Sequence, residues 1–163
     1  MTLVDHNVPR SLWIGVNVTG IIDHHDDRGL FAHASPRVIG QTASCSTLVV
    51  DHILRESHLH QNALADYPRE LIELLMKTIA IDSKGLRHRS STDLDHAIAK
   101  ELHAYSSWSD RRTRTTMRTL YKGVSAAKQA LEALTVRDLL RRDWKGDVYV
   151  ATWDSQCRKL GRD

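Results

Sequence analysis

Ile21-Ile22-Asp23-His24-His25-Asp26-Asp27 is the stretch from which the fold is best read, because an apolar β-branched run ends there in carboxylates and two adjacent imidazoles. Such a run is typical of a buried strand, and open α/β folds place ligands at the carboxyl ends of their strands. Imidazoles with carboxylates favour a transition metal such as Mn, Fe, Co or Zn over calcium. A solvated acidic turn with incidental histidines fits these residues alone equally well.

A second passage, Thr2-Leu3-Val4-Asp5-His6-Asn7, repeats this order of an apolar strand, an Asp and a His. A third apolar element, residues 71–81, delivers Asp82 followed by Ser83. Parallel strands that end side by side bring such residues to one edge of a sheet. We therefore expect Asp5 and Asp23-His24-His25 to lie at one edge of the sheet, and Asp82 fits the same plan.

Four motifs occur in order along the chain: VDHN (4–7), GIIDHHDD (20–27), SPRVIGQTASCSTLV (35–49) and IAIDS (79–83). Together they resemble the DHH phosphoesterase superfamily, and within it the group of fungal exopolyphosphatases and family II inorganic pyrophosphatases. The DHH triplet alone is a weak signal, whereas the ordered set is specific. Residues 134–145 resemble the opening of the second domain of that group, called DHHA2, so the resemblance covers nearly the whole chain.

The expected fold class is α/β, with a parallel, Rossmann-like sheet flanked by helices. By the resemblance, residues 1–105 form a DHH-type domain that lacks its first strands, and 117–163 begin a second α/β domain of the DHHA2 type. The polar, basic segment 106–116 is the expected linker.

Local patterns place the individual elements. Strands are expected at Leu3-Val4, before Asp23, at 37–39 and at 147–153. Helices are expected after Ser44, after an Asp66 cap and after a capping box formed by Thr92 and Asp95, and a helical period resumes at Leu120.

The resemblance implies a pair of divalent ions, Mn²⁺ or Mg²⁺, that activate a water for attack on a terminal phosphorus. Asp5 would be shared by both ions, His24 and Asp82 would bind one of them, and Asp23 would orient the histidines. His25 and His6 are the candidate catalytic residues that meet phosphate. The candidate substrate-binding residues are Asn7, Ser44, Ser46, Arg141, Arg142 and Lys145. For the two serines a plain helix cap is the alternative, and for the three basic residues a solvated helix face.

The family's first motif, a His or Asn followed by Asp-x-Asp, would precede Met1. Asp93-Leu94-Asp95 has the letters but opens a predicted helix. We therefore expect a metal-dependent hydrolase of phosphoanhydride bonds, acting on inorganic polyphosphate or pyrophosphate, with reduced or no activity. The alternative is a non-catalytic remnant that binds metal and polyphosphate.

Charge is unevenly distributed along the chain. Residues 1–83 hold 6 Lys or Arg against 10 Asp or Glu, and residues 84–163 hold 17 against 10. A basic second half could attract a polyanion or could be solvated surface. Nucleic acid is the less favoured partner, because interleaved aromatics and known binding modules are lacking.

The sequence predicts a cytoplasmic protein without a membrane anchor, because it contains no apolar run of about 20 residues. Cys45 and Cys157 form no CxxC pattern, which agrees with a reducing compartment. The histidines outside the motifs lack ligand spacing and are expected at the surface: His33, His52, His58, His60, His88, His96 and His103.

Overall fold

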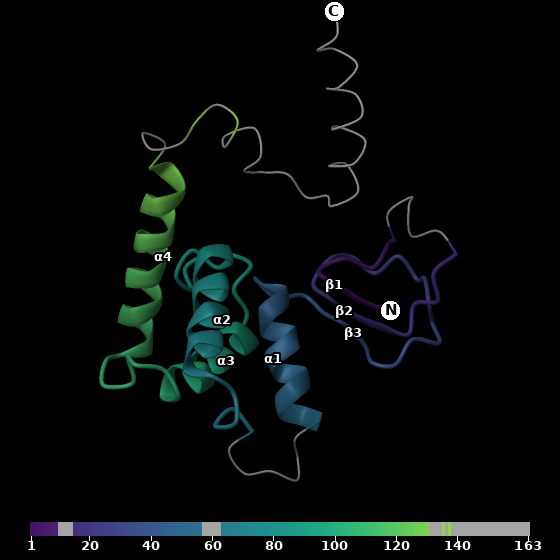
Figure 1. The fold of residues 1–163 in the computed structure, drawn as a ribbon, viewed down its shortest axis with the longest axis horizontal. Helices are drawn as coiled ribbons and strands as arrows, with labels where there is room; N and C mark the ends of the chain where they lie inside the picture. The colour runs from purple at the N-terminus through teal and green to yellow at the C-terminus, as the bar shows by residue number, and fades with distance from the viewer. Residues whose placement is uncertain (10–14, 57–62, 131–134, 136, 138–163) are drawn as a thin grey trace, which may run out of the picture. The chain divides into compact units, whose positions relative to one another are not determined.

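The computed structural model describes residues 1–9, 15–56, 63–130, 135 and 137 (Figure 1). The chain divides into two compact units, Met1–Ala127 and Lys128–Asp163. The first unit contains a parallel sheet followed by four helices. The predicted α/β class is therefore confirmed, whereas the strand expected at 147–153 lies outside the described residues.

The sheet consists of three short parallel strands, β1 (Thr2–Val4), β2 (Gly20–Asp23) and β3 (Arg37–Ile39), in the order β1-β2-β3. Its register pairs Val4 with Ile22 and Asp23 with Ile39. All three strands lie where the sequence predicted them. The parallel arrangement brings Asp5 and the residues after Asp23 to one edge of the sheet.

The two faces of β2 contact different apolar groups, as expected from the alternation of side chains along a strand. Ile22 packs against Cys45 and Leu48 of helix α1 (Cys45–Glu56). Ile21 packs on the other face against Leu3 and Val18. Helix α1 is thereby fixed against the central strand, with its amino terminus near the candidate site.

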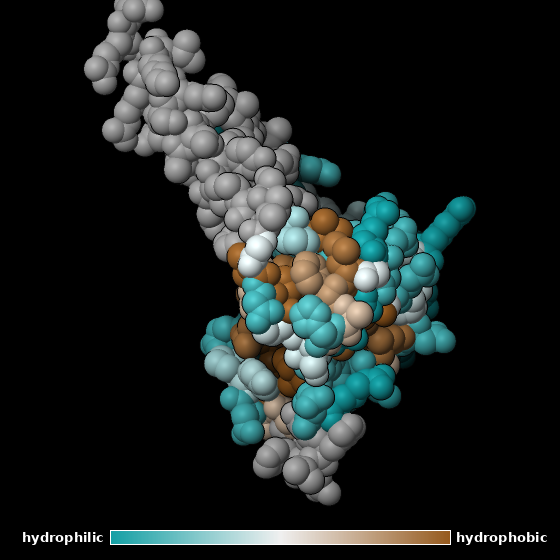
Figure 2. Space-filling view, turned by 90° about the vertical axis from the view of Figure 1, so that its right-hand side faces the viewer, coloured by the Kyte–Doolittle hydropathy of each residue, from teal (hydrophilic) through white to brown (hydrophobic). Residues whose placement is uncertain are grey.

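The side of the molecule that carries the sheet also exposes apolar side chains, which gather on the face seen in Figure 2. The large exposed apolar residues of the strands and their connections are Val4, Val8, Val16 and Leu30.

Helices α2 (Arg69–Asp82), α3 (Asp93–Ala104) and α4 (Thr113–Gln129) form a second core with α1. Its largest fully buried side chains belong to one apolar stripe on each helix. They include Val50, Ile72, Met76, Ile79, Leu102 and Met117. The described helices include no segment with both the length and the apolar character of a membrane span.

The caps of α2 and α3 test two local predictions. At α3, the Thr92 side chain accepts from the Asp95 amide while the Asp95 side chain accepts from the Thr92 amide, so the capping box is confirmed. At α2, the predicted Asp66 cap is wrong, because Pro68 occupies the cap position and makes no side-chain cap hydrogen bond.

Helix α4 begins at Thr113, inside the segment predicted as a linker. Nε2 of His103 lies 3.1 Å from the Thr116 hydroxyl, and both residues are buried. The expectation that His103 lies at the surface is therefore wrong, because contacts with the start of α4 bury its ring. The division into a DHH domain, a linker and a DHHA2 domain stays a prediction.

Candidate metal centre

The site begins where β1 ends. The amide of Asp5 donates to the Ile22 carbonyl at 3.0 Å and continues the ladder between β1 and β2. Asp5 then adopts a positive φ of 64°, which turns the chain out of the strand. Such a conformation is uncommon for residues other than glycine, although Asp tolerates it better than most. The turn places the carboxylate beyond the end of the sheet.

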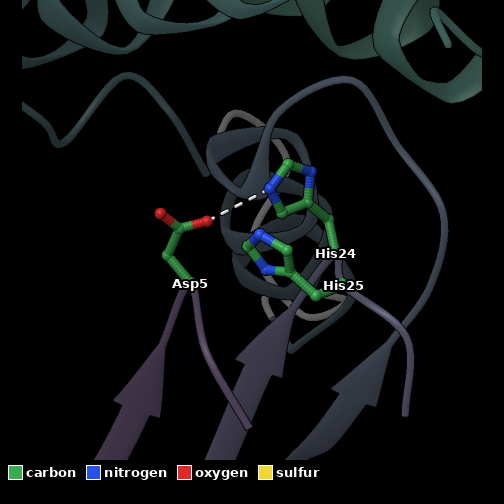
Figure 3. Close-up of side chains that lie close together, drawn as sticks. All are labelled: Asp5, His24 and His25. Atoms are coloured by element: carbon green, nitrogen blue, oxygen red, sulfur yellow. Dashed lines mark ion pairs between the residues drawn. The ribbon is translucent and has the colours of Figure 1, made fainter.

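Asp5, His24 and His25 come together at the carboxyl ends of β1 and β2 (Figure 3). One ligand atom from each lies within 4.8 Å of the others, which is close enough for a single metal ion. Oδ1 of Asp5 is 3.2 Å from Nε2 of His24. His24 is partly buried, whereas Asp5 and His25 are exposed and accessible to a ligand from solvent.

Both imidazole rings are held through their Nδ1 atoms. Nδ1 of His24 lies 2.9 Å from the Thr42 carbonyl oxygen, and Nδ1 of His25 lies 2.7 Å from Oδ1 of Asp23. A neutral ring that donates from Nδ1 keeps the lone pair of Nε2 for a metal, and metal-binding histidines are usually held in this way. The local hydrogen bonds therefore favour the tautomer that a metal site requires.

Asp23 is the buried anchor of this arrangement and is fully inaccessible to solvent. Its Oδ2 accepts a 2.6 Å hydrogen bond from the Asn7 side chain. Burial by itself would raise the pKa of Asp23, but the hydrogen bonds from His25 and Asn7 outweigh burial and hold the pKa below its ordinary value. Asp23 is therefore an ionised acceptor that faces His25.

Asn7 links the segment after β1 to the segment after β2 through hydrogen bonds. Besides Asp23, its amide nitrogen donates to the Asp26 carbonyl at 3.0 Å, and its Oδ1 accepts from the Arg28 amide at 3.2 Å. Asn7 is buried, so these bonds fix the loop that carries both histidines.

Asp82, the last residue of α2, contacts the residue that precedes α1. It is exposed, and its Oδ2 accepts a 2.6 Å hydrogen bond from the buried hydroxyl of Ser44. Asp82 does not belong to the group of three ligands formed by the described residues.

The buried thiol of Cys45 lies close to several carboxylates. Burial raises the pKa of the Cys45 thiol to about 11, and the negative charges of Asp5, Asp23 and Asp82 add to that rise. The three carboxylates therefore lie near the same thiol, which itself donates to the Ile22 carbonyl at 3.3 Å.

The other residues predicted to contact substrate are His6, Ser46 and three basic residues. His6 is exposed beside Asp5, with Nδ1 2.9 Å from the Val4 carbonyl oxygen. Ser46 is half-buried in the first turn of α1. Arg141, Arg142 and Lys145 lie outside the described residues.

The contribution of Thr42 could not be predicted from the sequence, because Thr42 holds His24 through a backbone carbonyl, which any residue type supplies.

Comparison with known proteins finds a protein that is similar over most of this chain. The chain is 32% identical over 157 residues to a protein of Schizosaccharomyces pombe described as "Putative exopolyphosphatase". The alignment covers 88% of this chain but 38% of the relative. No protein-family model matches the chain.

Proposed function

We propose that this chain takes part in metal-dependent hydrolysis of phosphoanhydride bonds, with inorganic polyphosphate or pyrophosphate as substrate. The observation that carries the proposal is the pair of imidazoles held through Nδ1, with Nε2 of His24 turned toward the Asp5 carboxylate. The similarity to the fission-yeast protein supports the choice of reaction and substrate.

The three ligands fit a transition metal such as Mn²⁺ better than Mg²⁺, because two of the three donors are imidazole nitrogens. A divalent ion bound here would supply a nucleophilic hydroxide at neutral pH and polarise a phosphoryl oxygen. Asp5 contributes negative charge to the ion, and the Thr42 carbonyl and the Asp23 carboxylate orient the two rings.

Asp82 is proposed as a further ligand on the same edge of the site. The Ser44 hydroxyl holds one of its oxygens, so the carboxylate is oriented before any ion arrives. His6 and Ser46 are proposed to meet the phosphate, together with Arg141, Arg142 and Lys145. Asn7 is buried and its side-chain amide donates a hydrogen bond to Asp23, so its proposed contribution is to position the loop that bears the histidines.

A non-catalytic metal and polyphosphate binder is the second candidate. It is favoured by the number of ligands, because the described residues gather one group of three, sufficient for one ion. Phosphoryl transfer between two metals needs ligands for both ions.

The test is phosphate release from tripolyphosphate with added Mn²⁺, compared among the wild-type chain, Asp5→Asn, His24→Ala and the control His96→Ala. His96 is an exposed histidine of α3 outside the ligand group. We expect release by the wild type and by His96→Ala, and a loss of at least about 100-fold in the two site variants. Metal binding without release would select the non-catalytic binder, and neither binding nor release would reject both candidates.

A further inference from the structure

Helix α4 carries a row of positive charge. Arg114, Arg118 and Lys122 follow one another at intervals of four residues, and such residues lie on one side of a helix. Residues 113–127 contain no Asp or Glu that could neutralise them. Arg114 and Lys122 are exposed and Arg118 is half-buried.

A second basic segment, residues 84–91, packs against this helix. A β-carbon on Gly85 would lie 3.0 Å from Cα of Arg118, so the two backbones are in close contact. Leu86 and Met117 are buried in the same core. The loop adds the exposed residues Lys84, Arg87 and Arg89, and it also lacks any acidic residue.

We call these six residues the basic surface: Lys84, Arg87, Arg89, Arg114, Arg118 and Lys122. Within the part of the chain that the structure describes, none of them takes part in an ion pair. Nε of Arg118 is buried without a hydrogen-bond partner among the same residues. Like charges at such spacing repel one another, so an anion bound across them would relieve that repulsion.

The basic surface begins next to Asp82, the residue proposed above as a further metal ligand. Helix α2 ends at Asp82, and Lys84 follows two residues later. A proposed metal ligand therefore ends α2, and the first basic residue lies in the loop that follows the helix. A linear anion with one end near Asp82 could continue along residues 84–89 to α4.

We propose that the basic surface binds the distal part of a linear polyphosphate chain whose terminal phosphate lies at the metal centre. This inference rests on the proposed function and adds a preference for long chains over short ones. Polyphosphate carries charge on every unit and no bases. The two segments offer cations but little for a base to stack on, since their one Phe, Tyr or Trp residue, Tyr121, is partly buried against the core.

The experiment measures the affinity of the full chain for long-chain polyphosphate and for tripolyphosphate at several salt concentrations. The variants are Arg114→Glu and Lys122→Glu, alone and combined, at exposed positions where folding should be preserved. The matched control is Arg69→Glu, an exposed arginine at the opposite end of α2 from Asp82, about 20 Å away along the helix. Circular dichroism verifies that each variant is folded.

We expect the double variant to bind long-chain polyphosphate at least about tenfold more weakly, with a shallower salt dependence. The ratio of long-chain to tripolyphosphate affinity should fall, and Arg69→Glu should retain the wild-type ratio. An unchanged ratio in the double variant, an equal fall in the control, or equally tight binding of single-stranded nucleic acid would overturn the inference. Phosphate release from tripolyphosphate by the wild type tests the proposed function separately, because it does not depend on the distal surface.

Discussion

Oδ1 of Asp5 lies 3.2 Å from Nε2 of His24, although the two residues follow different strands. The contact results from the parallel register of β1 and β2, which pairs Val4 with Ile22 and so makes the two strands end together. A slip of one residue would send the following side chains to opposite faces of the sheet. The candidate metal centre thus depends on the sheet register as well as on its own residues.

Asp95 is expected to be essential for stability, in contrast to its neighbour Asp93. Asp95 is fully buried, and its carboxylate accepts from the Thr47 hydroxyl at 2.6 Å and from the Ala43 amide at 3.0 Å. Asp95→Ala would leave these buried donors unpaired and should cost about 3 kcal/mol of the free energy of unfolding. Asp93→Ala, an exposed change in the first turn of α3, should cost about 0.5 kcal/mol. Urea unfolding measures both, and equal losses would contradict the structure.

Gly85 and Gly29 provide a matched pair of substitutions. Both have φ near +70°, but a β-carbon on Gly29 meets nothing within 4 Å, whereas one on Gly85 meets the backbone of Met117 and Arg118. Gly29→Ala should cost about 1 kcal/mol from the strained backbone alone. Gly85→Ala should cost about 3 kcal/mol, because α4 must also shift. Thermal or urea unfolding that ranks the two variants the other way would show that α4 does not pack on this loop.

Asp23 is expected to make the protein sensitive to acid. Because its folded pKa is lowered, its contribution to stability is fully present above the pKa of the unfolded chain and is lost as pH falls below about 4. The wild type should therefore lose more free energy of unfolding between pH 5 and pH 3 than Asp23→Asn does, measured without metal by urea titration. Asp26→Asn, at an exposed aspartate of the same loop, is the control and should follow the wild type. Parallel curves for wild type and Asp23→Asn would contradict this assignment.

Much of the fold could be predicted from the sequence, because its apolar segments have a clear period and the Thr92–Asp95 cap has a recognisable pattern. The start of α4 could not, since the segment from Thr113 is polar and its helix is stabilised by tertiary contacts such as that between His103 and Thr116. Local propensity gives no signal for such contacts.

The candidate site was predictable to a similar extent. Strand ends identified Asp5 and His24, which the structure brings together. The Thr42 carbonyl that holds His24 and the Ser44 hydroxyl that holds Asp82 depend on how β2, α1 and α2 meet in space. The spacing of residues along the chain does not show how these elements lie relative to one another in the fold.

The most direct test of the central claim, that Asp5 and the two imidazoles hold one metal ion, is pulsed electron paramagnetic resonance of Mn²⁺ bound to the chain. Imidazole nitrogens bound to the ion produce a nitrogen modulation of the signal. We expect modulation from two histidines in the wild type, from one in His24→Ala and in His25→Ala, and markedly weaker binding in Asp5→Asn. Bound Mn²⁺ without nitrogen modulation, or binding unaffected by all three substitutions, would contradict the claim.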